Sequence, residues 1–383
     1  MGDVSPASLI PIVVGGGFAL GFLFGFVGNK TNFCTMGAVS DVVNMGDWNR
    51  MRMWLLSIAV AILGATALEY AGVIKLSNSI YQTPNFTWLS YIVGGLVFGV
   101  GMTLASGCGS KTLMRVGGGN LKSLVVLVFM AIAAYMTLRG MFGAFRVNVL
   151  EQATIQMAGN QDIPSIVSRM TGAERPMVLL VTTLAVSGAL LLFAFMKREF
   201  RELDYILGGV VAGAVVVGGW YLSGKLGYIA EHPDTLQEAW VATNTGRMES
   251  FSFVAPQAFL LELLMLWTDK TKIVTFGIAS ALGVIVGSMA YALASKSFRL
   301  EAFRDASDMI RHMVGGILMG FGGVVALGCT VGQGITGFST LALGSIITFV
   351  AIILGAAATM KYEYWRMTDD SRTVRHRSRG HAV

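Results

Sequence analysis

One segment of this 383-residue chain occurs twice, with an offset of 221 residues. The sequence GGLVFGVGMTLASGCGS at 94–110 recurs as GGILMGFGGVVALGCTV at 315–331. Each copy is an apolar run that contains several glycines and ends in Gly-Cys, so Cys108 and Cys329 occupy equivalent positions. Such a duplication in a hydrophobic chain is typical of membrane transporters built from two related halves.

The composition indicates a membrane protein. Hydrophobic residues make up 54% of the chain and charged residues only 13%, whereas soluble domains carry about 25% charged residues. We therefore expect an all-α polytopic membrane protein. The net charge of +6 is modest and fits basic cytoplasmic loops, with no nucleic-acid partner. The three cysteines do not suggest a disulfide framework, and the four histidines have no metal-ligand spacing, so neither metal nor cofactor is expected.

The apolar segments predict about nine transmembrane helices, because a helix needs about 20 mostly apolar residues to cross a bilayer. The predicted spans are 9–27, 53–73, 89–107, 121–141, 177–196, 205–222, 273–294, 313–328 and 341–361. The apolar run 259–267 is too short to cross and is expected to be re-entrant or interfacial.

Lysine and arginine gather after the odd-numbered spans and in the tail, which places the N-terminus outside and the C-terminus in the cytoplasm. With this orientation, residues 9–142 and 205–362 start on opposite sides of the membrane and form two inverted repeats. Residues 143–204 would then hold an outer loop and a linking span, and residues 363–383 a basic cytoplasmic tail.

Both Gly-Cys sites are expected to end their helices early. The segments 107–120 and 328–340 are glycine-rich, and Gly is about 1 kcal/mol worse than Ala in a helix. A weaker correspondence aligns 28–36 with 246–254 and places Cys34 on Ser252. Broken backbone in a membrane must be buried in protein or line water. Four such re-entrant loops, two from each side, would form a narrow waist between two aqueous vestibules.

The waist is suited to an anion, because unpaired N–H groups at helix starts attract negative charge. Residues 89–142 and 309–362 contain no Asp or Glu. Lys111 and Arg115 would draw anions to the inner mouth. The candidate pathway residues are Cys34, Gly107, Cys108, Gly109, Ser252, Gly328, Cys329, Thr330 and Gln333.

Four stretches of the sequence resemble the YeeE/YedE family of membrane proteins of sulfur metabolism. They are GGILMGFGGVVALGCTVGQG, VGSMAYALASKSFRLEAF, TGRM at 245–248 and FVGNKTNFCTMGAVSDV, and the resemblance extends over about residues 15–362. It implies an hourglass-shaped monomer of nine spans in the inner membrane, with cysteines along a central path that fall on Cys34, Cys108 and Cys329. It also implies import of thiosulfate, relayed by weak hydrogen bonds from neutral thiols, and work beside a soluble sulfur-carrier protein.

Three alternatives stay open at this point. A membrane thiol redox enzyme or sensor would need a reactive cysteine, although no histidine or second cysteine lies near any Cys in the sequence. A membrane subunit that docks a sulfur carrier would show no flux alone, and a transporter of selenium compounds would carry the same motifs. Glu69 is a candidate proton-coupling group, but its place near the end of a span favours the outer interface. We expect a transporter and not an enzyme.

Overall fold

A computed structural model describes residues 6–233 and 235–380 of the chain. The fold is almost entirely helical. The α-helices are α1 (Pro6–Lys30), α2 (Thr35–Ser40), α3 (Asn49–Tyr70), α4 (Trp88–Leu104), α5 (Gly109–Gly117), α6 (Leu121–Arg139), α7 (Met141–Phe145), α8 (Ile163–Thr171), α9 (Arg175–Phe195), α10 (Leu203–Tyr221), α11 (Ala255–Met265), α12 (Phe276–Ala294), α13 (Ala306–Val325) and α14 (Leu343–Gly380).

Short elements lie at the ends of these helices and in the loops. Three are 3₁₀ turns, namely η2 (Leu76–Asn78), η4 (Arg198–Arg201) and η7 (Phe338–Thr340). Four are π turns, namely η1 (Asp41–Met45), η3 (Arg146–Leu150), η5 (Leu222–Leu226) and η6 (Gly332–Gly337). Two antiparallel pairs of two-residue strands complete the described fold, β1 (Asn85–Phe86) with β2 (Ile155–Gln156) and β3 (Tyr228–Ile229) with β4 (Ala239–Trp240).

Eight helical stretches in the described part of the chain are long and apolar enough to cross a membrane, which confirms an all-α polytopic membrane protein. The predicted span 313–328 forms α13, whose first turns carry Asp308, Arg311 and His312. These polar residues explain why α13 does not count among the eight. The apolar run 259–267 falls on α11, which has 11 residues and is too short to cross.

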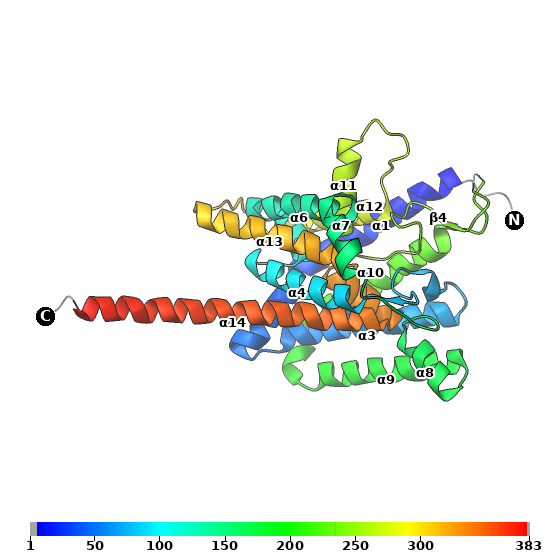
Figure 1. Cartoon of the computed structure of the whole chain (residues 1–383), viewed down its shortest axis with the longest axis horizontal. Helices are drawn as coiled ribbons and strands as arrows, with labels where there is room; N and C mark the ends of the chain where they lie inside the picture. The colour runs from blue at the N-terminus through cyan, green and yellow to red at the C-terminus, as the bar shows by residue number, and fades with distance from the viewer. Residues whose placement is uncertain (1–5, 234, 381–383) are drawn as a thin grey trace.

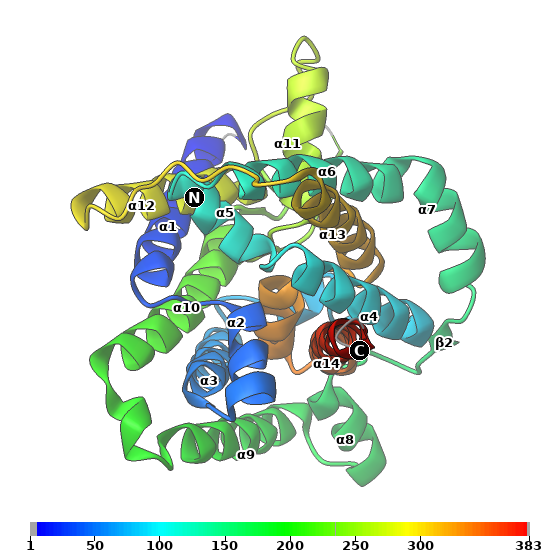
Figure 2. The ribbon, with the colours of Figure 1, turned by 90° about the vertical axis from the view of Figure 1, so that its left-hand side faces the viewer.

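The long helices run along one common direction. The start of α1 and the end of α14 lie at opposite ends of the molecule, and α14 projects well beyond the other helices (Figure 1). We call these the α1 end and the α14 end. Seen along this direction, α4, α13 and α14 lie together near the centre, whereas α9 lies at the periphery beside α3, with α8 next to one end of α9 (Figure 2). Helix α11 points sideways out of the bundle in both views.

Side-chain caps define where several helices begin. Asn120 Oδ1 accepts a hydrogen bond from Ser123 N (2.8 Å) at the start of α6, and Asp305 Oδ1 accepts one from Asp308 N (2.7 Å) at the start of α13. These oxygens satisfy N–H groups that have no partner within the helix. The sequence therefore sets these helix starts locally.

Glycines allow α4 and α13 to approach closely, and they do so reciprocally. A Cβ on Gly94 would lie 2.6 Å from Ala326 N, and a Cβ on Gly315 would lie 2.6 Å from Ala105 N. Gly315 is the repeat equivalent of Gly94, and Ala326 that of Ala105. Each copy of the repeated segment thus packs against the other through the same positions.

Candidate functional site

Helices α4 and α13 end in the same way, immediately before the two Gly-Cys pairs. Ser106 (φ 56°) and Leu327 (φ 58°) adopt the left-handed conformation, which non-glycine residues rarely adopt. The next residues close the helices with matching bonds, from Gly107 N to Met102 O (3.0 Å) and from Gly328 N to Gly323 O (2.8 Å). Both helices therefore end in a Schellman motif, and the chain turns before it can cross the membrane as one straight helix.

Short helices follow these breaks. Cys108 is the N-cap residue of α5, which begins at Gly109. Cys34 occupies the same position before α2, where its Sγ accepts a hydrogen bond from Gly37 N (3.4 Å). After Cys329 the chain passes into the η6 turn, and Gly332 N donates to Cys329 Sγ (3.4 Å).

The interrupted segments meet in the interior. Thr35 Oγ1 donates to Cys108 Sγ (3.9 Å), which joins the first break to the second. Phe253 N donates to Cys329 Sγ (3.3 Å), which joins the loop that contains Ser252 to the last break. The thiols of Cys34 and Cys108 interact with each other, and Cys108 lies within electrostatic range of Cys329. The structure thus brings the three predicted cysteines together.

The meeting point is closed to water and surrounded by aromatic rings. Cys108 and Cys329 are fully buried, and Cys34 is 5% exposed. The Phe24 ring stacks on Phe253 with 5.7 Å between centroids and meets the edge of Phe33 at 5.8 Å. Phe33 and Phe253 belong to two different interrupted segments, so Phe24 of α1 bridges them.

The remaining predicted residues border this point. Gly109 faces Phe253, since a Cβ there would lie 3.4 Å from Phe253 O, and Gly332 leaves room for the hydroxyl of Ser252. Gln333 Nε2 donates to Ala326 O. Gln333 Oε1 is buried and has no hydrogen-bond partner among the described residues. Thr330 Oγ1 is also buried, and its only polar neighbour among those residues is the weakly bonding thiol of Cys108. An unsatisfied buried acceptor or donor costs about 1–3 kcal/mol, so both are available to a polar solute.

A cavity of about 140 Å³ lies on the side of the meeting point nearer the α1 end, which we call the cavity at the α1 end, and it reaches the last break. Ser252 and Gly328 lie in its wall. Tyr81, Arg146 and Glu249 also line it, and none of them was among the residues predicted for the path. Tyr81 and Glu249 lie in irregular segments, and Arg146 begins the η3 turn. Of the three, only Glu249 had a signal in the sequence, because it lies within the aligned 246–254 segment.

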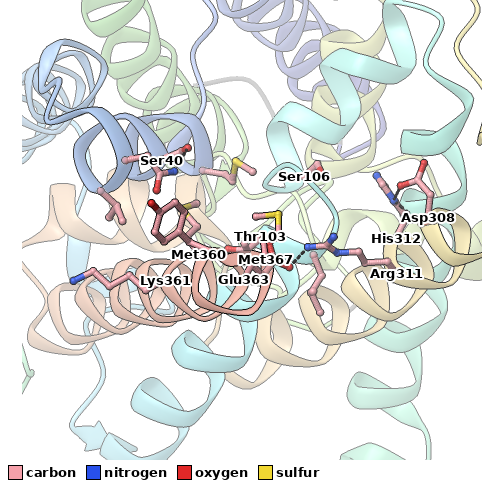
Figure 3. Close-up of a pocket in the computed structure, with 15 residues that line it drawn as sticks. Ser40, Thr103, Ser106, Asp308, Arg311, His312, Met360, Lys361, Glu363 and Met367 are labelled. Atoms are coloured by element: carbon pink, nitrogen blue, oxygen red, sulfur yellow. Dashed lines mark hydrogen bonds and ion pairs between the residues drawn. The ribbon is translucent and has the colours of Figure 1, made fainter. Parts of the chain in front are cut away.

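A second pocket of about 720 Å³ lies on the side of the meeting point nearer the α14 end, between α2, the end of α4, the start of α13 and α14. Its residues include Ser106, which directly precedes Gly107. Arg311 of α13 forms an ion pair with Glu363 of α14, and His312 Nδ1 lies 3.1 Å from Asp308 Oδ1 (Figure 3). This pocket therefore holds charges of both signs.

Two cations stand close to the Cys34 and Cys108 pair. Lys111 Nζ donates to Asn32 Oδ1 (3.2 Å) and interacts electrostatically with both thiols. Arg115 donates to Ser106 O (2.8 Å) at the end of α4. Both cations predicted for the inner mouth therefore lie beside the break.

A polytopic membrane protein whose broken helices meet between two cavities has the architecture of a transporter of small solutes. The chain belongs to the sulphur transport family, which matches residues 30–358. It is 29% identical over 342 residues to the thiosulfate transporter TsuA of Escherichia coli (strain K12), an alignment that covers 88% of this chain and 91% of the relative. It is 26% identical over 354 residues to the thiosulfate transporter TsuA of Spirochaeta thermophila, an alignment that covers 88% of this chain and 96% of the relative.

Proposed function

We propose that this protein imports thiosulfate, or a closely related sulfur-containing anion, across the inner membrane into the cytoplasm. The observation that carries the proposal is the meeting of three buried thiols between two cavities, in a chain whose relatives are named thiosulfate transporters. The anion would enter from the cavity at the α1 end and leave through the pocket at the α14 end.

The thiols would relay the anion through weak hydrogen bonds. A neutral thiol is a weak S–H donor, and the terminal sulfur of thiosulfate carries part of the negative charge. Sites in a permeation path must bind the solute yet release it quickly, which favours several weak contacts over one strong one. Thr330 and Gln333 offer buried polar atoms close to Cys329 in the sequence. Cys108 stands at the N-terminus of α5, where the helix dipole favours negative charge.

We also propose that the two halves are inverted repeats around an hourglass-shaped path, with the N-terminus outside. The reciprocal glycine contacts between α4 and α13 and their matching Schellman ends support this proposal. Lys111, Arg115 and Arg311 lie toward the α14 end, as expected if that end faces the cytoplasm.

The test is uptake of radiolabelled thiosulfate into proteoliposomes that contain only this protein, with sulfite, sulfate, selenite and tetrathionate as competitors. Flux by the purified protein would exclude a role as a mere docking subunit for a sulfur carrier.

Because each thiol contact contributes about 1 kcal/mol, Cys108→Ala and Cys329→Ala should each lower uptake roughly fivefold or more. Ser187→Ala is the matched control, since Ser187 is equally buried but lies on the peripheral helix α9. Unchanged uptake in both cysteine variants would remove the thiols from the mechanism.

A further inference from the structure

Glu249 is a carboxylate in the wall of the cavity at the α1 end, three residues before Ser252. The backbone holds it in a defined position. Its Oε1 accepts hydrogen bonds from Thr245 N (2.6 Å) and Thr245 Oγ1 (2.8 Å), and its own N–H donates to Ser223 Oγ (3.2 Å). The carboxylate is therefore a fixed part of the cavity.

No cation pairs with Glu249 among residues 6–233 and 235–380. Arg146 lines the same cavity, but its Nε lies 3.4 Å from Glu151 Oε1. Tyr81, which approaches from the loop before β1, interacts electrostatically with both Glu249 and Cys329. The adjoining segments also carry Lys225 and Arg247, and both are exposed. Burial raises the pKa of the Glu249 carboxyl above its usual value.

We propose that Glu249 is a proton-controlled entry residue, which admits the substrate anion when it is protonated and repels the anion when it is charged. The inference rests on the proposed function. Glu249 and Gly328 line the same cavity, so an anion that crosses this cavity toward Gly328 comes close to Glu249. Two like charges in a cavity partly screened from water repel each other strongly. Protonation replaces this repulsion with a neutral carboxyl that can donate a hydrogen bond.

Binding of the anion in the cavity and binding of the proton to Glu249 are thermodynamically linked. If protonation raises the affinity for the anion, the anion raises the affinity of Glu249 for the proton by the same factor. Uptake should therefore increase as the pH on the cavity side falls. Above the pKa of Glu249 the protonated fraction changes up to about tenfold per pH unit, and below it the rate should level off.

The experiment measures the initial rate of thiosulfate uptake by proteoliposomes as the external pH is lowered from 8 to 5.5 at constant internal pH. The wild-type rate should rise several-fold. Glu249→Gln mimics the protonated state, so its rate should be high and nearly independent of pH. Glu231→Gln is the matched control, because Glu231 is an exposed acid in the nearby connection between β3 and β4 and should leave the wild-type profile unchanged.

A second measurement on the wild-type protein covers the case in which Glu249→Gln does not fold. Addition of thiosulfate to purified protein in weak buffer near pH 7 should cause proton uptake. Four results would each overturn the inference. Two concern the pH profile, namely a wild-type rate that does not depend on pH and a Glu249→Gln variant that keeps the full pH dependence. The other two are a folded Glu249→Gln variant without uptake and thiosulfate binding without proton uptake. Absence of any uptake above empty liposomes, even at pH 5.5, would instead refute the proposed function and the inference with it.

Discussion

The packing of α4 against α13 depends on glycines at which any side chain must move a helix. A Cβ on Gly315 would lie 2.6 Å from Ala105 N and 2.8 Å from Gly101 O. Both are backbone atoms that cannot rotate away, and ordinary contacts lie at about 3.5–4.0 Å. The substitution Gly315→Ala therefore requires α13 to move by about 1 Å away from α4.

This movement lowers the free energy of unfolding. Overpacking of a close-packed interior costs about 1–3 kcal/mol, and two backbone obstacles place Gly315→Ala near the upper value. Alanine recovers about 1 kcal/mol through its higher helix propensity. We expect a net loss of about 2 kcal/mol in the free energy of unfolding, or roughly 30-fold in the ratio of folded to unfolded protein.

The assay is equilibrium unfolding of purified protein in detergent, together with thiosulfate uptake. Gly188→Ala on α9 is the control, because a Cβ there has no neighbour within 4 Å and should stabilise the protein by up to about 1 kcal/mol. Gly94→Ala should match Gly315→Ala, and the double variant should lose less than the sum, because one helix shift accommodates both methyl groups. If Gly315→Ala proved as stable as Gly188→Ala, the reasoning from close approach would be wrong.

The remaining predictions concern charged and polar groups, two of them beside the path and one at the periphery. Lys111→Met should lower thiosulfate uptake roughly tenfold at low ionic strength, and the difference should shrink as salt is raised, because screening weakens long-range attraction. Gln333→Leu should lower the free energy of unfolding by about 1–3 kcal/mol, measured in detergent, because it leaves the buried carbonyl of Ala326 unpaired. Arg175 contacts Glu69 (3.1 Å) and Asp162 (3.5 Å), so Arg175→Met should cost about 1–2 kcal/mol in the same assay, less than a fully buried pair because Arg175 is partly exposed.

The contacts of Arg175 also bear on Glu69, which was a candidate for proton coupling. Glu69 lies at the end of α3 and pairs with the first residue of the peripheral helix α9. This position agrees with the interpretation that Glu69 lies near the end of a span. Its contacts join α3 to α9, away from the meeting point of the thiols.

The helix breaks were predictable because their causes are local. An apolar run forms a helix in a membrane, and clustered glycines after it favour a turn. The structure accordingly ends α4 at Leu104 and α13 at Val325, each two residues before a Gly-Cys pair. The duplication itself also indicated that the two breaks would have the same geometry.

The sequence by itself determined that this chain is helical, membrane-embedded and broken at its Gly-Cys sites, because hydrophobicity and backbone preference act over a few neighbouring residues. Only the tertiary structure decided which breaks meet. Thr35 reaches Cys108 across 73 residues, and Phe253 reaches Cys329 across 76. It also placed Arg146 and Glu249 in one cavity. Such contacts arise from helices that pack through distant glycines, and no local pattern records which distant surface a glycine will meet.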